Sequence, residues 1–289
     1  MNLLTKRIFL LLFFFLPNLL SLASSFGEKW KHATYYFGWG YNRDWYSKGN
    51  VHLRNDNPQL INGTYYTYDF TVYKAKAHDR AQLDEIKNVA HITIPQYSVR
   101  LGAFLNDKQD IGFELNYDHA KYVVEYYQKV RVKGHVNGQY FDQDTILDPN
   151  TFLHYEHTDG ANFFMFTFMK RYKFLNATSG KHLLSWVVKP GLGFVYPRTD
   201  VTIFGSRVNN DWKISGVIGG LETGLRYEFF KHGYLELTGK GGRANYINTL
   251  VQGKGYGRAS NSFWFFEAIA ILGYQFNINR SSEGSLLRK

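Results

Sequence analysis

Apolar and polar residues alternate through most of the chain, which is the pattern of strands whose two faces meet different surroundings. Between 214 and 230 the even positions hold mainly Gly, Glu or Arg, and the odd positions are mainly apolar. The ranges 93–105, 110–118 and 182–196 sort in the same way. A tilted strand needs about 10 residues to cross a membrane. The pattern therefore predicts membrane-spanning strands with one apolar and one polar face.

Further strands are expected at 33–45, 157–174 and 264–278, where aromatic residues gather on one parity. In the range 234–247, apolar and polar residues do not separate cleanly onto odd and even positions. We expect a β-bulge there, near the glycines at 239–242. With this range included, the count is eight. We therefore predict an all-β fold, an antiparallel up-and-down transmembrane β-barrel of about eight strands.

The connections between these strands alternate in length, as they do in barrels with short periplasmic turns and long outer loops. This alternation places both termini in the periplasm. The segment 65–77 is itself strand-like: it is either a hairpin above the membrane or part of a ten-stranded barrel, and we prefer eight strands. A soluble β-sandwich is a further alternative, but its connections need not alternate. The short turns are 106–107, 176–180 and 231–233, and the long outer loops are 47–91, 125–152, 199–212 and 248–260.

The N-terminus has the three-part layout of a secretory signal peptide. Lys6 and Arg7 precede the apolar run 8–16, and small residues follow at 21–25. The apolar run is too short for a spanning helix, which needs about 20 residues. We predict cleavage after Ala23 or Ser25 and export to the outer membrane of a Gram-negative bacterium. The expected parts are a signal peptide at 1–23, a barrel with its outer loops at 24–278 and a polar tail at 279–289.

The composition of the chain limits the chemistry it can carry. There is no Cys, which excludes disulfides, thiolate metal sites and a cysteine nucleophile. The formal charge is +10, but Lys and Arg are scattered rather than gathered in one run. We therefore expect contact with outer-membrane lipid and the phosphates of lipopolysaccharide, and not with nucleic acid. An aromatic content of 18% supplies the Tyr and Trp that such a protein needs at the membrane interface.

The last predicted strand ends in a sequence with a family resemblance. Gly273, Phe276 and Ile278 have the spacing of the C-terminal assembly signal of bacterial outer-membrane barrels. By this signal and its strand pattern, the mature chain resembles the small bacterial outer-membrane β-barrel superfamily, the class of the outer-membrane protein A barrel. The resemblance implies that the barrel-assembly machinery reads the last strand. The chain departs from the pattern because it continues beyond this strand to Lys289.

The alternation also places charged residues of both signs inside the barrel. An eight-stranded barrel is only wide enough for side chains to fill it, so we predict that these charges pair as an ionic plug. The favoured function is a structural or surface-interaction barrel whose ligand the sequence does not name, and a narrow pore is an alternative. The predicted lumen residues are Arg100, Glu114, Asn116, Asp118, Arg171, Lys189, Glu222, Arg226, Glu228 and Glu267.

Another alternative is an enzyme that modifies lipid A or phospholipid. His157 and Asp159 lie two apart at the predicted outer rim, where a carboxylate beside His could orient a general base. Ser215 is a weak candidate for the nucleophile. The alternative is that His157 and Asp159 are rim residues that only hydrogen-bond a loop. The chain also lacks the His-and-Ser motif of lipid A hydrolases. We therefore favour a protein without enzymatic activity, cofactor or metal.

Overall fold

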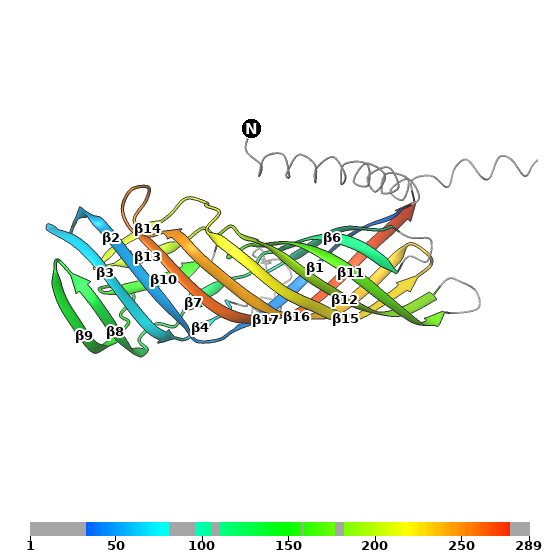
Figure 1. Cartoon of the computed structure of the whole chain (residues 1–289), viewed down its shortest axis with the longest axis horizontal. Helices are drawn as coiled ribbons and strands as arrows, with labels where there is room; N and C mark the ends of the chain where they lie inside the picture. Colours follow the sequence, from blue (N-terminus) through cyan, green and yellow to red (C-terminus); the bar gives the residue numbers. More distant parts are fainter. Residues whose placement is uncertain (1–32, 81–95, 106–109, 158, 177–181, 278–289) are drawn as a thin grey trace, which may run out of the picture.

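The computed structural model describes residues 33–80, 96–105, 110–157, 159–176 and 182–277. Within this part of the chain, eight antiparallel strands follow one another around a closed sheet (Figure 1). β1 closes the ring by pairing with β17, from Thr34 opposite Asn277 to Tyr46 opposite Phe265. The predicted eight-stranded up-and-down barrel is confirmed. Its strands are β1 (Thr34–Tyr46), β5 (Ser98–Phe104), β6 (Ile111–Asp118), β11 (Phe163–Asn176), β12 (His182–Val195), β15 (Gly216–Phe229), β16 (Gly233–Leu250) and β17 (Arg258–Asn277).

One side of the barrel wall continues past the rim as a four-stranded extension. The first residues of β17, from Arg258 to Ser262, pair with β2 instead of β1. The strands β3, β8 and β9 continue the sheet from β2, at the left of Figure 1. The segment predicted at 65–77 is therefore a hairpin arm beyond the barrel and not a ninth barrel strand. The extension consists of β2 (Gly49–Ile61), β3 (Thr64–Ala75), β8 (Lys129–Val136) and β9 (Gln139–Ile146).

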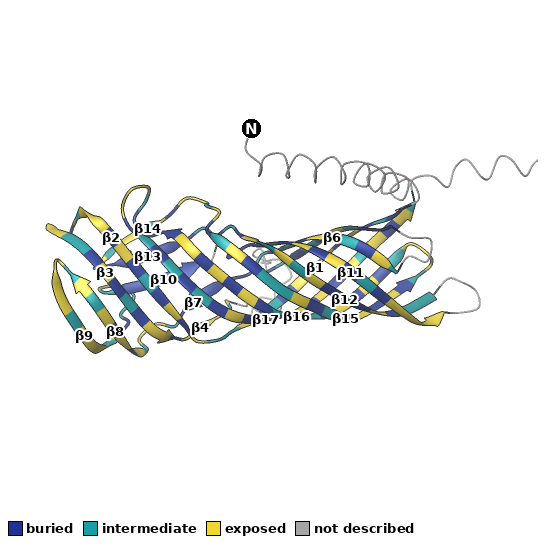
Figure 2. Cartoon of the chain, in the orientation of Figure 1, coloured by how far each residue is buried: buried dark blue, intermediate teal, exposed yellow. Residues whose placement is uncertain are grey.

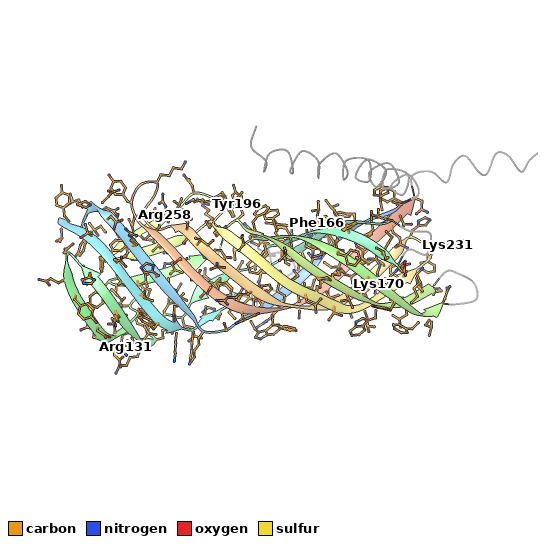
Figure 3. The ribbon with its side chains drawn as sticks, in the orientation of Figure 1. Arg131, Phe166, Lys170, Tyr196, Lys231 and Arg258 are labelled. Carbon is orange, nitrogen blue, oxygen red and sulfur yellow. The ribbon has the colours of Figure 1, made fainter. Side chains whose placement is uncertain are left out.

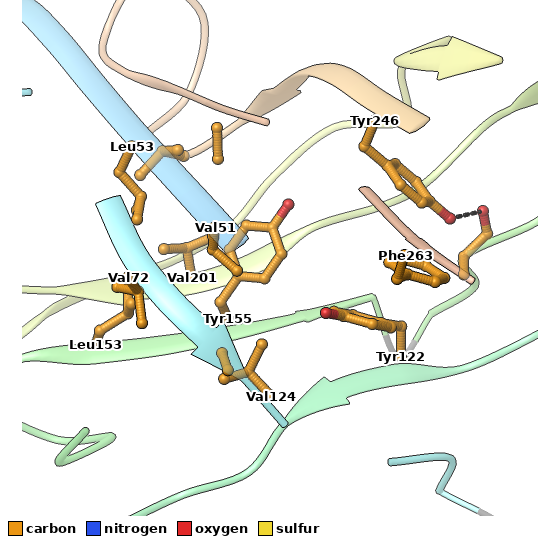
Figure 4. Close-up of a cluster of buried hydrophobic side chains, with 14 of the residues drawn as sticks. Val51, Leu53, Val72, Tyr122, Val124, Leu153, Tyr155, Val201, Tyr246 and Phe263 are labelled. Atoms are coloured by element: carbon orange, nitrogen blue, oxygen red, sulfur yellow. Dashed lines mark hydrogen bonds between the residues drawn. The ribbon is translucent and has the colours of Figure 1, made fainter. Parts of the chain in front are cut away.

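A second sheet of five short strands packs against the inner face of this extension. Val51 and Val72 of the extension share one apolar core with Tyr155 and Val201 of the second sheet (Figure 4). All four side chains are fully buried. The order of this sheet is β14-β13-β10-β7-β4. Its strands are β4 (Ala77–His78), β7 (Tyr122–Val124), β10 (Leu153–His157), β13 (Asp200–Ile203) and β14 (Ser206–Asn209).

Three of the long connections predicted as loops thus contain β-structure. The alternate buried residues of β2, β3 and β8 leave one apolar face that must be covered, and the short strands from the other connections cover it. The fourth predicted barrel strand, at 157–174, is also corrected. It comprises the end of β10, which belongs to the second sheet, and β11, which begins at Phe163.

Buried and exposed residues alternate along the barrel strands, as Figure 2 shows. The bulge predicted near the glycines at 239–242 is absent, because β16 keeps its alternation and its register through them. The register shifts instead between Tyr246 and Thr249. The pattern of β16 looked poor because Gly239 and Gly241 occupy outward positions that are apolar in the other strands.

No helix among the described residues is long and apolar enough to cross a membrane. The predicted signal peptide, Ile278 of the assembly signal and the polar tail lie outside the described residues.

Candidate functional site: the barrel interior and its outer rim

The barrel strands bring oppositely charged side chains together in the interior. Each of the nine charged residues predicted for the lumen is buried. Two more, Glu236 and Lys240, join them from β16. In the described part of the chain, ion pairs therefore link five cations to six carboxylates: Arg100, Arg171, Lys189, Arg226 and Lys240 with Glu114, Asp118, Glu222, Glu228, Glu236 and Glu267.

The part of this network nearer the outer rim is built by residues far apart in the sequence. Arg100 of β5 donates to Asp118 of β6 over 2.7 Å and to Glu222 of β15 over 3.3 Å. Lys240 of β16 pairs with Asp118 and, over 2.9 Å, with Glu267 directly opposite on β17. These contacts connect five of the eight barrel strands across the interior.

Lys189 joins this part to a second group of charges nearer the chain termini. Its ammonium lies 3.1 Å from Glu114, 3.2 Å from Glu222 and close to Glu236. Arg226 in turn bonds Glu236 over 3.2 Å, and its guanidinium lies 3.5 Å from the ring centre of Tyr234. Each charge of this network thus has an opposite charge in contact, which offsets the cost of removing it from water.

Sequence reasoning missed Glu236 and Lys240, although the signal was present. Both stand at even positions of β16, in phase with Glu222 and Arg226 on the preceding strand. The glycines on the outward face hid this regularity. The predicted amide Asn116 does point inward, and its side chain donates to Glu222 over 3.4 Å.

Apolar side chains pack against the charged ones at both ends of the barrel interior. Toward the chain termini, Tyr36, Phe104 and Ile271 belong to one buried cluster. Toward the rim, Phe163 and Phe265 belong to the core that continues into the extension. Toward the termini the charged and apolar side chains are interleaved, since the Arg171 guanidinium lies 4.0 Å from the ring centre of Phe104.

The outer surface of the barrel is apolar on every strand. Phe166 lies on this face, with Lys170 and Lys231 toward one end of the molecule and Arg258 and Arg131 toward the other (Figure 3). Exposed aromatic and aliphatic side chains would be costly in water over so continuous an area. They include Phe37, Trp39, Tyr41, Leu101, Leu115, Phe166, Phe168, Tyr172, Trp186, Leu192, Phe194, Val217, Leu221, Leu225, Leu237, Trp264, Phe266, Leu272 and Phe276.

The three residues proposed for a hydrolase are not brought together. His157 is fully buried, and neither of its ring nitrogens has a hydrogen-bond partner among the described residues. Asp159 is at the surface and pairs with Arg198 over 3.0 Å. The buried Ser215 hydroxyl donates to the carbonyl of Lys213. The predicted pairing of His157 with Asp159 is therefore wrong, because β10 ends at His157 and the chain turns through Gly160.

A different His–carboxylate pair occurs on the opposite face of β10. His154 Nε2 lies 3.0 Å from Glu156 Oε2, and both side chains are buried. The Tyr126 hydroxyl donates to the same carboxylate over 3.2 Å, and Arg80 donates to it over 2.9 Å. Burial and the Glu156 charge raise the pKa of Tyr126. Because Arg80 pairs with Glu156, the cluster resembles a structural ion-pair network more than an exposed general base.

No group of three or more His, Asp or Glu side chains among the described residues is placed to hold a metal ion.

Together, the closed sheet, the apolar outer face and the polar interior define the architecture of a small membrane β-barrel. Comparisons with protein-family models and with curated proteins find no match. Among solved structures, the attachment invasion locus protein Ail of Yersinia pestis is similar at 8% identity, with 85% of this chain and 99% of that chain covered and a TM-score of 0.28.

Two further solved structures give similar values. Neisserial surface protein A is 11% identical, with 81% of this chain and 96% of that chain covered and a TM-score of 0.30. The outer membrane protein OprG from Pseudomonas aeruginosa is 15% identical, with 85% and 96% covered and a TM-score of 0.29. Such values transfer no function to this chain.

Proposed function

We propose that this chain is an outer-membrane β-barrel protein with a closed, charge-filled lumen and a structural or surface-interaction role. The observation that carries the proposal is the reversed polarity of the barrel. Its outer face is apolar on all eight strands, and its interior holds the paired charges. A barrel folded in water would expose the charges and bury the aromatic residues, whereas a lipid environment favours the arrangement seen.

The paired charges and the apolar side chains packed against them also favour a barrel that does not conduct. An eight-stranded barrel leaves room for little more than its own side chains. Arg100, Lys189 and Lys240 each contact two or more carboxylates, so these three cations are not free to line a water-filled path. We expect the extension and the second sheet, on the outer side, to be the part that meets a ligand or another surface.

Two measurements test this function. The mature protein should fractionate with the outer membrane and migrate differently on a gel before and after boiling, since a closed strand network resists detergent until heated. In planar bilayers it should show negligible steady conductance, and Glu222→Ala should destabilise the barrel or cause brief openings. A soluble periplasmic product or large stable currents from the unmodified protein would refute the proposal.

The assembly route and the enzymatic alternative need separate tests. We infer that the barrel-assembly machinery reads β17, which carries Gly273 and Phe276. A lipid-modifying enzyme would change the acyl chains or headgroups of the membrane, whereas a passive barrel would not. Mass spectrometry should therefore find the same lipid A in cells with and without the protein, and a difference would restore the hydrolase hypothesis.

A further inference from the structure

A groove on the outer side of the extension is lined by cations and by no carboxylate. It has a volume of about 550 Å³. Its lining residues are Lys48, Tyr73, Lys74, Lys129, Val130, Arg131 and Lys133. Five of these seven side chains are positively charged, which makes the groove a strong candidate for an anionic ligand.

The strands build this groove in two ways. In β8, Lys129, Arg131 and Lys133 alternate with buried Val130 and Val132, so the three cations share one face. The row is regular, with about 7 Å between successive side chains. Arg131 projects from the lower edge of the extension in Figure 3.

In β3, an irregularity turns a fourth cation toward the groove. The pairing with β2 shifts register between Gly49 and Val51, opposite Tyr73 and Lys74. Lys74 has a φ of 52°, a left-handed conformation that is unusual for Lys. Its N–H donates to the Asn50 side chain over 2.9 Å, which holds the turn. As a result Tyr73 and Lys74 are both exposed and Ala75 is buried again, although strict alternation would bury Lys74.

The positive charge of the groove is only partly neutralised. Arg131 makes a two-pronged contact with Asp142 of β9, over 2.6 and 2.7 Å. Lys129 lies 3.4 Å from Asp144, but both carboxylates flank the groove and do not line it. No carboxylate of the described residues lies within ion-pair distance of Lys48 or Lys74. Five cations against two carboxylates leave an excess of three positive charges (5 − 2 = 3).

The groove begins where the apolar face of the barrel ends. Ser47, next to Lys48, donates its N–H to the carbonyl of Trp264 and accepts the Trp264 N–H with its hydroxyl, both over 2.9 Å. The Trp264 side chain is 61% exposed and Trp45 is 51% exposed. Exposed Trp beside cations is typical of the membrane–water interface. The groove is thus placed at the level of lipid headgroups if the apolar face lies in the bilayer.

From this placement we propose that the groove binds the phosphate groups of a phosphorylated membrane glycolipid, whose acyl chains lie beside Trp45 and Trp264. The proposal rests on the membrane location argued above. A lipid fits better than a free anion because exposed single ion pairs are weak. A lipid held in the membrane plane presents its phosphates at high local concentration and adds apolar contact.

The test removes the two cations that lack a carboxylate partner. The variant is Lys48→Gln with Lys74→Asn, because Asn tolerates the left-handed backbone. The matched control, Lys231→Gln with Lys254→Gln, also removes two positive charges, but outside the groove. Each protein is refolded in zwitterionic detergent, checked for heat-modifiable migration, and assayed by native mass spectrometry with bisphosphorylated lipid A, dephosphorylated lipid A or inorganic phosphate.

We expect the unmodified protein and the control to retain bisphosphorylated lipid A, and the groove variant to bind it about fivefold to tenfold more weakly. Dephosphorylated lipid A and inorganic phosphate should bind weakly to all three proteins. Equal retention of the two lipids, or equal retention by variant and control, would overturn the groove proposal. Inorganic phosphate bound as tightly as the lipid would assign a free-anion site instead, which also overturns it. A protein that fails to fractionate with the outer membrane would refute the proposed function, a result distinct from these.

Discussion

The ring of Tyr234 lies over Gly273, its direct partner on the neighbouring strand. A Cβ added to Gly273 would collide with ring atoms of Tyr234 and with the backbone carbonyl of Phe37. Gly38, opposite Gly273 on β1, leaves space for the same ring. The guanidinium of Arg226 then packs against that ring at 3.5 Å. The glycine in the predicted assembly signal therefore also has a packing role in the barrel interior.

Gly273→Ala should destabilise the folded barrel by about 1–3 kcal/mol, the range typical of overpacked interiors. The reason is that neither the Tyr234 ring nor the β-sheet backbone can move far. Unfolding in urea, followed by Trp fluorescence in lipid vesicles, measures the effect. Gly241→Ala is the matched control, since a Cβ there would meet no atom within 4 Å. Equal unfolding midpoints for the two variants would show that Tyr234 is free to shift.

Phe276→Asp should sharply reduce insertion into the outer membrane. Phe276 is an exposed aromatic residue of β17, and a charge there would face lipid. Tyr140→Asp makes the same kind of change at an exposed position of β9, outside the barrel, and should leave insertion intact. Removal of 279–289 should have a much smaller effect than Phe276→Asp. Heat-modifiable protein in the membrane fraction is the readout, and similar losses for all three changes would contradict the placement of the barrel end.

Alternation was sufficient to predict the barrel because each strand separates lipid from the interior, so the requirement repeats at every second residue. The strands of the second sheet have no such requirement. β10, for example, is buried at all five positions from Leu153 to His157. A strand covered on both faces has no period to detect. For this reason, alternation did not reveal the second sheet, whereas the segment 65–77 in the extension was recognised as strand-like.

The same reasoning explains which interior residues could be found. Glu222 and Arg226 alternate with apolar residues on β15, so the sequence predicts that their side chains point into the barrel. Lys240 was missed because its neighbours Gly239 and Gly241 are not apolar, so no alternation of apolar and polar residues marks this part of β16. The groove cations could not be assigned from sequence, because Lys74 departs from strict alternation at a register shift and lies far in sequence from Lys129.

Lys240→Met should cost about 3–5 kcal/mol of folding free energy, because it leaves the buried Glu267 without a cation and Asp118 with Arg100 alone. Asp118 and Glu267 both contact this ammonium, and none of the three side chains is exposed. Lys254→Met, at a side chain that is 83% exposed, should have almost no effect. Adding Glu267→Gln to Lys240→Met should recover part of the loss, since the two positions are coupled. Simple additivity of the two changes in urea midpoints would contradict a direct pairing.

His157 should make the outer part of the protein sensitive to acid. Burial among aromatic rings, including Tyr246 at 4.8 Å, lowers the pKa of His157 from 6.5 to about 3. The unfolded chain takes up a proton below about pH 6.5 and the folded chain does so only near pH 3. Between these values this residue therefore lowers stability by about 1.4 kcal/mol for each pH unit of acidification. Going from pH 7.5 to pH 5 should cost about 2 kcal/mol through His157 alone.

His157→Phe isolates this contribution from that of the acidic residues. The substitution keeps a ring of similar shape, and it breaks no hydrogen bond to the described residues because neither nitrogen has a partner there. Removing a buried, unsatisfied polar group should leave stability at pH 7.5 unchanged or higher. Unfolding midpoints at pH 7.5 and pH 5 should then differ less in His157→Phe than in the unmodified protein. His135→Phe, at an exposed position of β8, should retain the full pH dependence. The same pH dependence in all three proteins would mean that water reaches His157 and that its burial does not control its charge.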